Sequence, residues 1–214
     1  ADATREMLAV LRDGSWEQSS EKVVELLNRG VSPQSLWDAL FSHAAEMLMR
    51  KPGIISLHAC TTTNAMHFAH QHTFNDETRR FLLLQNAAFL PLFRARAGAE
   101  RGVRIDALEP AAAGGVDEVF ADLSGNRSLA AQRSLAYLQQ GGSASDFIAA
   151  AQRLIYLKGT DSHDYKFSSA VLEDYRNMSP QLRDPFLAAS VFWLKGAEAP
   201  DSGLVARTRS ALGA

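Results

Sequence analysis

The chain has 214 residues, of which 46% are apolar and 21% charged, and its 22 Lys and Arg against 24 Asp and Glu give a formal net charge of −2. This composition suits a globular protein with a core and excludes a disordered or collagen-like chain. The near-neutral charge gives no electrostatic reason to expect a nucleic-acid partner. The single cysteine, Cys60, excludes an internal disulfide and a cysteine-rich zinc site. Any metal must therefore be held by other ligands.

No apolar run approaches the roughly 18 residues that cross a bilayer. The longest candidate, residues 81–93, is interrupted by Gln85, Asn86 and Pro91. We therefore expect no membrane span and a soluble protein, located in the cytoplasm rather than exported. The chain opens on Ala-Asp-Ala-Thr without Met, which fits removal of Met, cleavage of a targeting peptide, or excision from a longer chain.

Apolar residues recur at helical spacing along most of the chain, whereas the alternation typical of strands is nearly absent. We therefore expect an all-α fold, a multi-helix bundle. Residues 1–214 form either a single domain or two packed halves that divide near residue 110. Start and stop signals predict helices over about residues 15–28, 33–50, 54–72, 76–96, 116–123, 128–140, 144–157, 162–176 and 180–194, and near Leu204.

The predicted helix over residues 76–96 carries apolar residues on all sides, including Phe81, Leu84, Phe89 and Leu92. A helix that is apolar all round is buried. We therefore expect residues 76–96 to form the central helix of the bundle, with a kink at Pro91 because proline removes one backbone hydrogen bond.

Common catalytic signatures are absent: the chain has no nucleophile elbow, no phosphate-binding loop, no dinucleotide fingerprint, no metalloprotease helix motif and no covalent haem motif. No nucleotide cofactor is therefore expected. Cys60 lies on an apolar helix, which favours a core residue over a thiol nucleophile. The chemistry then depends on the six histidines, which are His43, His58, His67, His70, His72 and His163.

His58 shares one side of the predicted helix 54–72 with apolar residues such as Ile54 and Met66. An imidazole that faces a core must be hydrogen-bonded, neutral or bound to a metal, so a structural histidine and a ligand are both open. His67 lies on the opposite side of this helix. His43 comes from the preceding antiparallel helix and can converge with His58, as in bundles that build metal sites from facing helices.

His70 and His72 fall at the end of the same helix, where the dipole favours a partly protonated ring. We interpret both as structural.

A second informative stretch begins at Asp161 or Ser162, either of which can cap a helix. His163 and Lys166 then lie in its first turns, where positive charge opposes the helix dipole. Such local conflicts tend to mark functional sites. The alternative is a salt bridge from Lys166 to Asp161 or to another acid.

Two segments, H-A-C-T-T-T-N-A-M over residues 58–66 and D-S-H-D-Y-K over residues 161–166, resemble the H-x-V-T-x-x-x-A-L and D-x-H-x-x-K patterns of the questin oxidase-like family. That family consists of all-helical proteins linked to oxidation of aromatic polyketides, and Cys60 stands where its pattern has Val. The resemblance implies a site formed by His58, His163 and Lys166. Imidazoles suit iron or another first-row metal, whereas Lys166 would need to be deprotonated or carboxylated to act as a ligand.

Two hypotheses follow. In the first, the protein is a metal-dependent, non-haem-iron-like oxygenase for a hydrophobic or aromatic small molecule, with a metal at His58 and His163 and with His43, His67 or Lys166 as further ligands. In the second, it is a non-catalytic helical interaction or assembly module whose histidines are structural. The helices of Trp16 and Trp193 would then dock a protein partner or a second copy. A bound haem is a third alternative.

Overall fold

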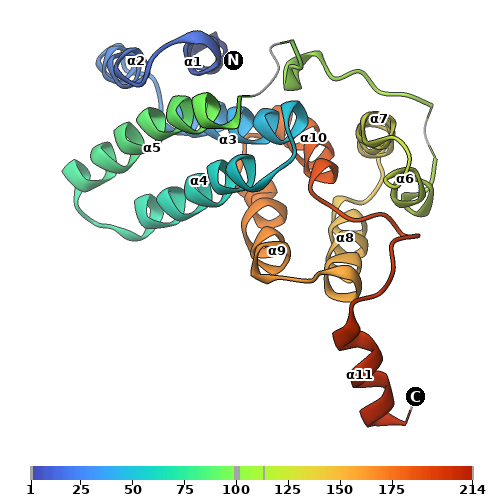
Figure 1. Ribbon diagram of the computed structural model, residues 1–214. Helices are drawn as coiled ribbons and strands as arrows, with labels where there is room; N and C mark the ends of the chain where they lie inside the picture. Colours follow the sequence, from blue (N-terminus) through green and yellow to red (C-terminus); the bar gives the residue numbers. More distant parts are fainter. Residues whose placement is uncertain (1, 99–101, 113, 214) are drawn as a thin grey trace.

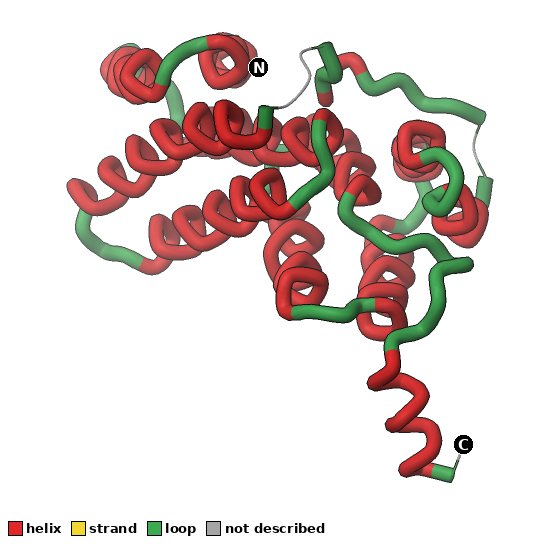
Figure 2. Tube along the Cα trace, viewed as in Figure 1, coloured by secondary structure: helices red, strands yellow, loops and turns green. Residues whose placement is uncertain are grey.

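The computed structural model describes residues 2–98, 102–112 and 114–213, and within these ranges it contains helices, turns and loops but no strand (Figures 1 and 2). The prediction of an all-α multi-helix bundle is confirmed. The helices are α1 (Asp2–Asp13), α2 (Trp16–Asn28), α3 (Pro33–Arg50), α4 (Ile54–His72), α5 (Asp76–Ala97), α6 (Val116–Asp122), α7 (Arg127–Gln139), α8 (Ala144–Lys158), α9 (Ser162–Asp174), α10 (Pro180–Ala189) and α11 (Gly203–Leu212). Short 3₁₀ turns η1 (Ile105–Ala107), η2 (Tyr175–Asn177) and η3 (Ser190–Phe192) connect or extend them.

Local capping explains why many predicted helices begin where the structure places them. The Ser15 side chain accepts a hydrogen bond from the Gln18 backbone N–H, and the Gln18 side-chain oxygen accepts one from the Ser15 backbone N–H, which is a complete capping box. The Asn75 side chain accepts from the Thr78 backbone at the start of α5. These side chains satisfy backbone donors that have no partner inside the helix.

The helix α1 is not among the helices that we predict from the sequence. Its Met7, Leu8 and Leu11 are buried, and α1 packs against α3 and α2. Because this apolar stripe faces α3 (Pro33–Arg50), the helix covers part of the core at one edge of the bundle (Figure 1).

The most buried helix is α3, and the prediction that residues 76–96 form the central helix is wrong. Every residue of α3 from Leu36 to Met49 is buried. In α5, by contrast, Phe81 and Leu92 are exposed, and the helix continues through Pro91 to Ala97. The apolar pattern gave the wrong central helix for two reasons. The helix α3 carries polar residues that are satisfied by partners on other elements, and part of the apolar surface of α5 faces solvent.

Glu46 shows how the core accepts a charged residue of α3. Its carboxylate is fully buried and accepts hydrogen bonds from the Arg12 side chain, from the Arg50 side chain and from the Ile105 backbone. Arg12 also pairs with Asp106 at 2.7 Å. A buried charge is tolerated when it is paired and hydrogen-bonded in this way.

One cluster of buried apolar residues extends through both halves of the chain. α3 contacts α10, and α4 contacts α9, so segments on either side of residue 110 share the core. The helix α11 projects from the bundle and has no buried residue (Figure 1). Within the described ranges, none of the helices combines the length and the apolar character needed to cross a membrane.

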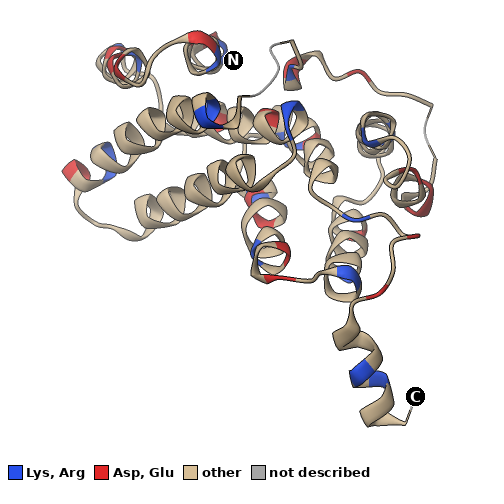
Figure 3. Ribbon diagram, viewed as in Figure 1, with Lys and Arg blue, Asp and Glu red and all other residues tan. Residues whose placement is uncertain are grey.

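Charged residues are distributed over the bundle with one exception: α4 carries no Lys, Arg, Asp or Glu along its whole length (Figure 3). Its polar residues are instead histidines, threonines, an asparagine, a glutamine and a serine. Parts of this helix are exposed, including Ile54, His58 and Phe68. A partly exposed helix with four histidines and no charge is the feature of the fold that positions the candidate site.

Candidate functional site

His58 on α4 and His163 on α9 lie side by side, with ring centroids 5.6 Å apart and ring planes inclined by 38°. They come from the two motifs quoted above, and the packing of α4 against α9 brings them together. His58 is exposed and His163 is half-buried. The pair therefore lies at the surface of the seam between the two helices.

The expectation that His58 sits on the core-facing side of α4 is wrong. The buried stripe of α4 includes Leu57, Cys60, Thr63 and His67, which places His58 outside it. Thr63 and His67 belong to this stripe although they are polar, because hydrogen bonds within α4 and from Asn86 satisfy Thr63, and aromatic rings enclose His67. The Thr63 hydroxyl donates to the Ala59 carbonyl at 2.9 Å, so its burial leaves no unpaired donor.

Asp161 caps α9 and orients His163. Its carboxylate accepts a hydrogen bond from the His163 backbone at 2.7 Å and lies 3.2 Å from the ring Nδ1. The backbone hydrogen bond from His163 lowers the pKa of Asp161, with a smaller contribution from the ring. When Nδ1 carries the proton, it donates to Asp161 and leaves Nε2 free. Metal-binding histidines commonly have such a carboxylate partner.

Lys166 lies one turn beyond His163 and is exposed. Within the described residues, Lys166 makes no ion pair: Asp161 contacts His163, and Asp164 pairs with Lys195 at 3.2 Å. The predicted salt bridge from Lys166 is therefore absent from this part of the chain.

A cavity of about 570 Å³ begins one turn along both helices from the histidine pair. It has a polar part, formed by the Thr61, Thr62, Asn64, Lys166 and Ser169 side chains, and an apolar part, formed by Ala65, Met66, Ala69, Leu82 and Ala170. Its size and mixed lining suit a small organic molecule.

His67 does not join this pair. It is buried on the opposite side of α4, with its ring 4.9 Å from Trp37 and 5.0 Å from Phe41. Burial lowers the pKa of His67 to about 4, with a contribution from His70. The prediction that His58 and His67 face opposite sides of one helix is confirmed.

His43 lies elsewhere in the core. It is fully buried, and neither ring nitrogen has a hydrogen-bond partner within the described residues. Burial, with the positive charges of Arg50, Arg94 and Arg12, lowers the pKa of His43 well below its ordinary value. These arginines belong to α1, α3 and α5, so His43 faces that side of α3 and not the seam of α4 and α9.

Two further sequence interpretations can be compared with the structure. The ring Nδ1 of His72 lies 2.7 Å from the Phe68 carbonyl, as expected for a residue that completes a helix end. Cys60 is buried, its Sγ contacts the Ala44 carbonyl at 3.3 Å, and burial raises the pKa of its thiol. A buried thiol of this kind is a core residue and not a nucleophile.

Over residues 2–98, 102–112 and 114–213, no three His, Cys, Asp or Glu side chains form a group that could hold a metal ion. Two imidazoles bound to one tetrahedral ion have ring centroids about 5 Å apart, given a metal–nitrogen distance of about 2 Å. The separation of His58 and His163 is compatible with this value. The described residues therefore offer two imidazoles whose separation permits a shared ion, and they do not supply the third ligand that a mononuclear iron centre commonly has.

Sequence reasoning missed Asp174, at the end of α9. This carboxyl group is almost completely buried and accepts hydrogen bonds from the Asn64 side chain at 2.9 Å and the Asn177 side chain at 3.2 Å. Burial raises its pKa to about 7. Because Asn64 lines the cavity, a carboxyl group that can hold a proton near neutral pH lies directly behind the cavity wall. The sequence did contain a signal for this residue: Asp174 is an acidic residue at the end of a helix, shortly after the apolar pair Val171 and Leu172.

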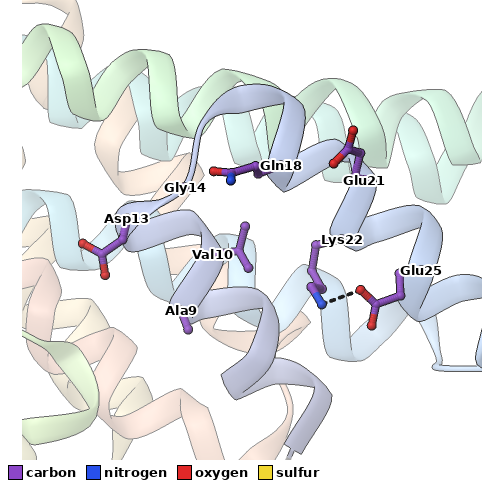
Figure 4. A pocket seen from close by; sticks show the side chains of 8 residues that line it. All are labelled: Ala9, Val10, Asp13, Gly14, Gln18, Glu21, Lys22 and Glu25. Carbon is purple, nitrogen blue, oxygen red and sulfur yellow. Dashed lines mark hydrogen bonds and ion pairs between the residues drawn. The ribbon is translucent and has the colours of Figure 1, made fainter.

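A larger groove of about 710 Å³ lies between α1 and α2 (Figure 4). Lys22 pairs with Glu25 on the same helix, and Asp13, Gln18 and Glu21 are exposed. These polar side chains belong to the solvent-facing surfaces of the two helices. The residues that line the groove therefore do not form a cluster of buried or converging catalytic groups.

Comparison of the chain with protein-family models, with curated proteins and with solved structures finds no match.

Proposed function

We propose that this protein is a metal-dependent, non-haem-iron-like oxygenase that acts on a hydrophobic or aromatic substrate, with His58 and His163 as imidazole ligands. The observation that carries the proposal is the meeting of these two rings in the fold. They belong to two motifs that are far apart in the sequence, and the resemblance to the questin oxidase-like family pairs the same two residues. The contact between Asp161 and His163 adds support, because it leaves Nε2 free for an ion.

A bound ion would supply an open coordination position for activation of O₂. Asp161 holds the His163 ring in place, and the apolar part of the cavity, around Met66 and Leu82, accommodates a hydrophobic substrate. Lys166 at the cavity edge is available to pair with an anionic substrate group or, as a carbamate, to serve as a third ligand. Asp174, whose pKa burial raises to about 7, lies behind the cavity wall and can exchange a proton near neutral pH.

The metal content of the protein tests the proposal directly. Protein purified without a chelating tag is expected to contain a transition metal, or to bind about one Fe²⁺ or Co²⁺ per chain under anaerobic titration. His58→Ala and His163→Ala should each weaken that binding at least about tenfold, since even loss of a residue that supports a ligand costs about 10- to 100-fold.

His72→Ala is the matched control, because His72 is an exposed histidine on the same helix and lies outside the pair. Its metal affinity should equal that of the wild type. The proposal is overturned if the wild type binds no transition metal, or if the His163→Ala variant keeps full occupancy.

The interaction module is a second candidate, and exposed aromatic residues favour it. Phe74, in the connection between α4 and α5, is 98% exposed, and the nearby Phe68 and Phe81 are exposed as well. Trp16 is also exposed, whereas Trp193 is half-buried against Phe167, so the Trp193 ring does not offer the docking surface expected from the sequence. The three phenylalanines follow one another across the connection between α4 and α5, and exposed apolar residues that gather in one region often mark contact surfaces. Protein without metal that self-associates in light-scattering measurements, and becomes monomeric as Phe74→Ser, would support this candidate over the oxygenase.

A further inference from the structure

A second cavity, of about 480 Å³, lies near the other end of α4, where α5 packs against both α4 and α2. Its lining consists of Val24, Leu27, Asn28, Pro33, His70, Asp76, Arg79, Arg80, Leu83 and Leu84. The volume falls within the range of about 300–1,000 Å³ typical of small-molecule sites. His70 and His58 lie near opposite ends of α4, so this cavity is separate from the candidate metal site.

The walls of this cavity are largely aliphatic. Leu83 is buried, Leu27 and Leu84 are half-buried, and Val24 is exposed at the edge. These side chains come from α2 and α5, which pack against each other. An aliphatic tail placed here would remove apolar surface from water on both sides.

Arg79 gives the cavity an unpaired polar group. Its Nε is buried and has no hydrogen-bond partner within the described residues. The neighbouring Arg80 is different, because its guanidinium pairs with Asp76 at 2.5 Å and both side chains are exposed. A guanidinium N–H that is shielded from water without an acceptor is unfavourable. The rest of the Arg79 guanidinium also has no hydrogen-bond or ion-pair partner within the described residues, and because Arg79 lines the cavity, these N–H groups can meet an anionic acceptor there.

His70 lies beside this group. Burial and the charge of Arg79 lower the pKa of His70, whereas the charge of Asp76 opposes this shift. Among the Arg and Asp side chains that line the cavity, Arg80 pairs with Asp76, which leaves the positive charge of Arg79 uncompensated next to the apolar walls. The Asp76 carboxylate at the edge disfavours a ligand with a second negative charge.

We propose that this cavity binds a small molecule with one carboxylate and an aliphatic tail, the carboxylate accepting a hydrogen bond from Arg79 and the tail lying against Leu27, Leu83 and Leu84. A guanidinium recognises a carboxylate through charge-assisted hydrogen bonds. A monoanion fits better than a phosphate dianion, since Arg79 is the single unpaired charge among the lining residues. This inference does not depend on the proposed oxygenase function.

Isothermal titration calorimetry with octanoate tests the proposal, and octanamide serves as the neutral probe of the same shape. Octanoate should bind at least about tenfold more tightly than octanamide. The reason is that the carboxylate of octanoate is negatively charged and can pair with Arg79, whereas the amide of octanamide is neutral. Hexanoate should bind about tenfold more weakly than octanoate, since two methylene groups leave the apolar wall.

Arg79→Gln should weaken octanoate binding at least about tenfold and leave octanamide binding unchanged. Arg96→Gln is the matched control, since it makes the same charge change on an exposed side chain of the same helix, outside the lining of the cavity, and it should change octanoate affinity less than about twofold. Circular dichroism shows whether each variant is folded. If Arg79→Gln does not fold, Arg79→Lys replaces it, and the loss of the planar guanidinium with its paired N–H donors should still weaken octanoate binding several-fold.

Three results would overturn the proposal. These are the absence of saturable octanoate binding at millimolar concentration, equal affinities for octanoate and octanamide, and wild-type octanoate affinity in the folded Arg79 variant.

Discussion

Polar and charged residues have different surroundings in the interior of the bundle around α3 and in the outer seam between α4 and α9. In the interior, Glu46 is fully enclosed by arginines and a backbone donor, and His67 is enclosed by aromatic rings. At the seam, His58 and His163 face each other at the surface, beside a cavity. The interior groups have exchanged water for fixed partners, whereas the seam groups keep room for a ligand.

This difference teaches which histidines can carry chemistry. A buried imidazole such as His67 is held neutral by its surroundings and packs against the Trp37 and Phe41 rings. A histidine pair at the surface of a seam keeps free nitrogen atoms and access from solvent. We therefore expect interior substitutions to change the free energy of unfolding, and seam substitutions to change ligand binding.

The largest effect should come from the interior ion network. Glu46→Gln removes the charge that pairs with Arg12 and Arg50, and breaking a buried pair of this kind costs about 3–5 kcal/mol because the remaining charges stay buried. Urea denaturation measures this loss. Asp76→Asn, which breaks the exposed pair with Arg80, should cost less than about 1 kcal/mol. Similar losses in the two variants would erase the distinction between interior and surface.

Asp174 should show a strong dependence on pH. Its pKa is raised from 3.8 to about 7 by burial, so the folded state keeps a proton that the unfolded state releases. Its contribution to stability therefore falls as pH rises from about 4 to 7. In the Asp174→Asn variant this pH-dependent loss is absent. The free energy of unfolding of the variant minus that of the wild type should therefore be about 2–4 kcal/mol larger at pH 8 than at pH 4. Denaturation curves at the two pH values check this, and a difference independent of pH would contradict it.

His67 should show the opposite dependence, with a smaller effect. Burial lowers its pKa from 6.5 to about 4, so the unfolded state binds a proton first as pH falls. The wild type then loses stability between pH 6.5 and 4. His67→Phe, which suits the surrounding Trp37 and Phe41, should gain about 2 kcal/mol relative to the wild type over that interval.

The seam gives the matched control for His67→Phe. His58→Phe changes an exposed residue on the same helix and should alter stability at pH 7 by less than about 0.5 kcal/mol. A large loss of stability in His58→Phe, or a flat pH difference in His67→Phe, would show that the two regions are not distinct in the way described.

The sequence predicted much of the helical framework because the signals that start and stop helices are local. Ser15, Ser32 and Asn75 act on backbone groups two or three residues away, and the predicted bounds 54–72 coincide with α4. The two motifs also identified His58 and His163 before the fold brought them together. The helix α1 was missed although its apolar stripe has helical spacing.

Burial could not be predicted in the same way, because it depends on partners that are distant in the sequence. From residue type alone, we predicted that the apolar helix α5 is more buried than α3. In the structure, however, Glu46 of α3 pairs with Arg12 of α1, and Asp38 of α3 accepts a hydrogen bond from the Ser179 hydroxyl at 2.6 Å. These contacts let α3 occupy the centre despite its polar residues. The buried carboxyl of Asp174 and the unpaired Nε of Arg79 are likewise properties of packing.

The sequence by itself therefore determined the helical class, the capped starts of several helices and two of the residues in the candidate site. Only the tertiary structure decided which helix is central, which histidines are enclosed and which pair faces solvent. The physical reason is range: capping and helix propensity act within one turn of the chain, whereas desolvation and pairing depend on every element that packs against a residue.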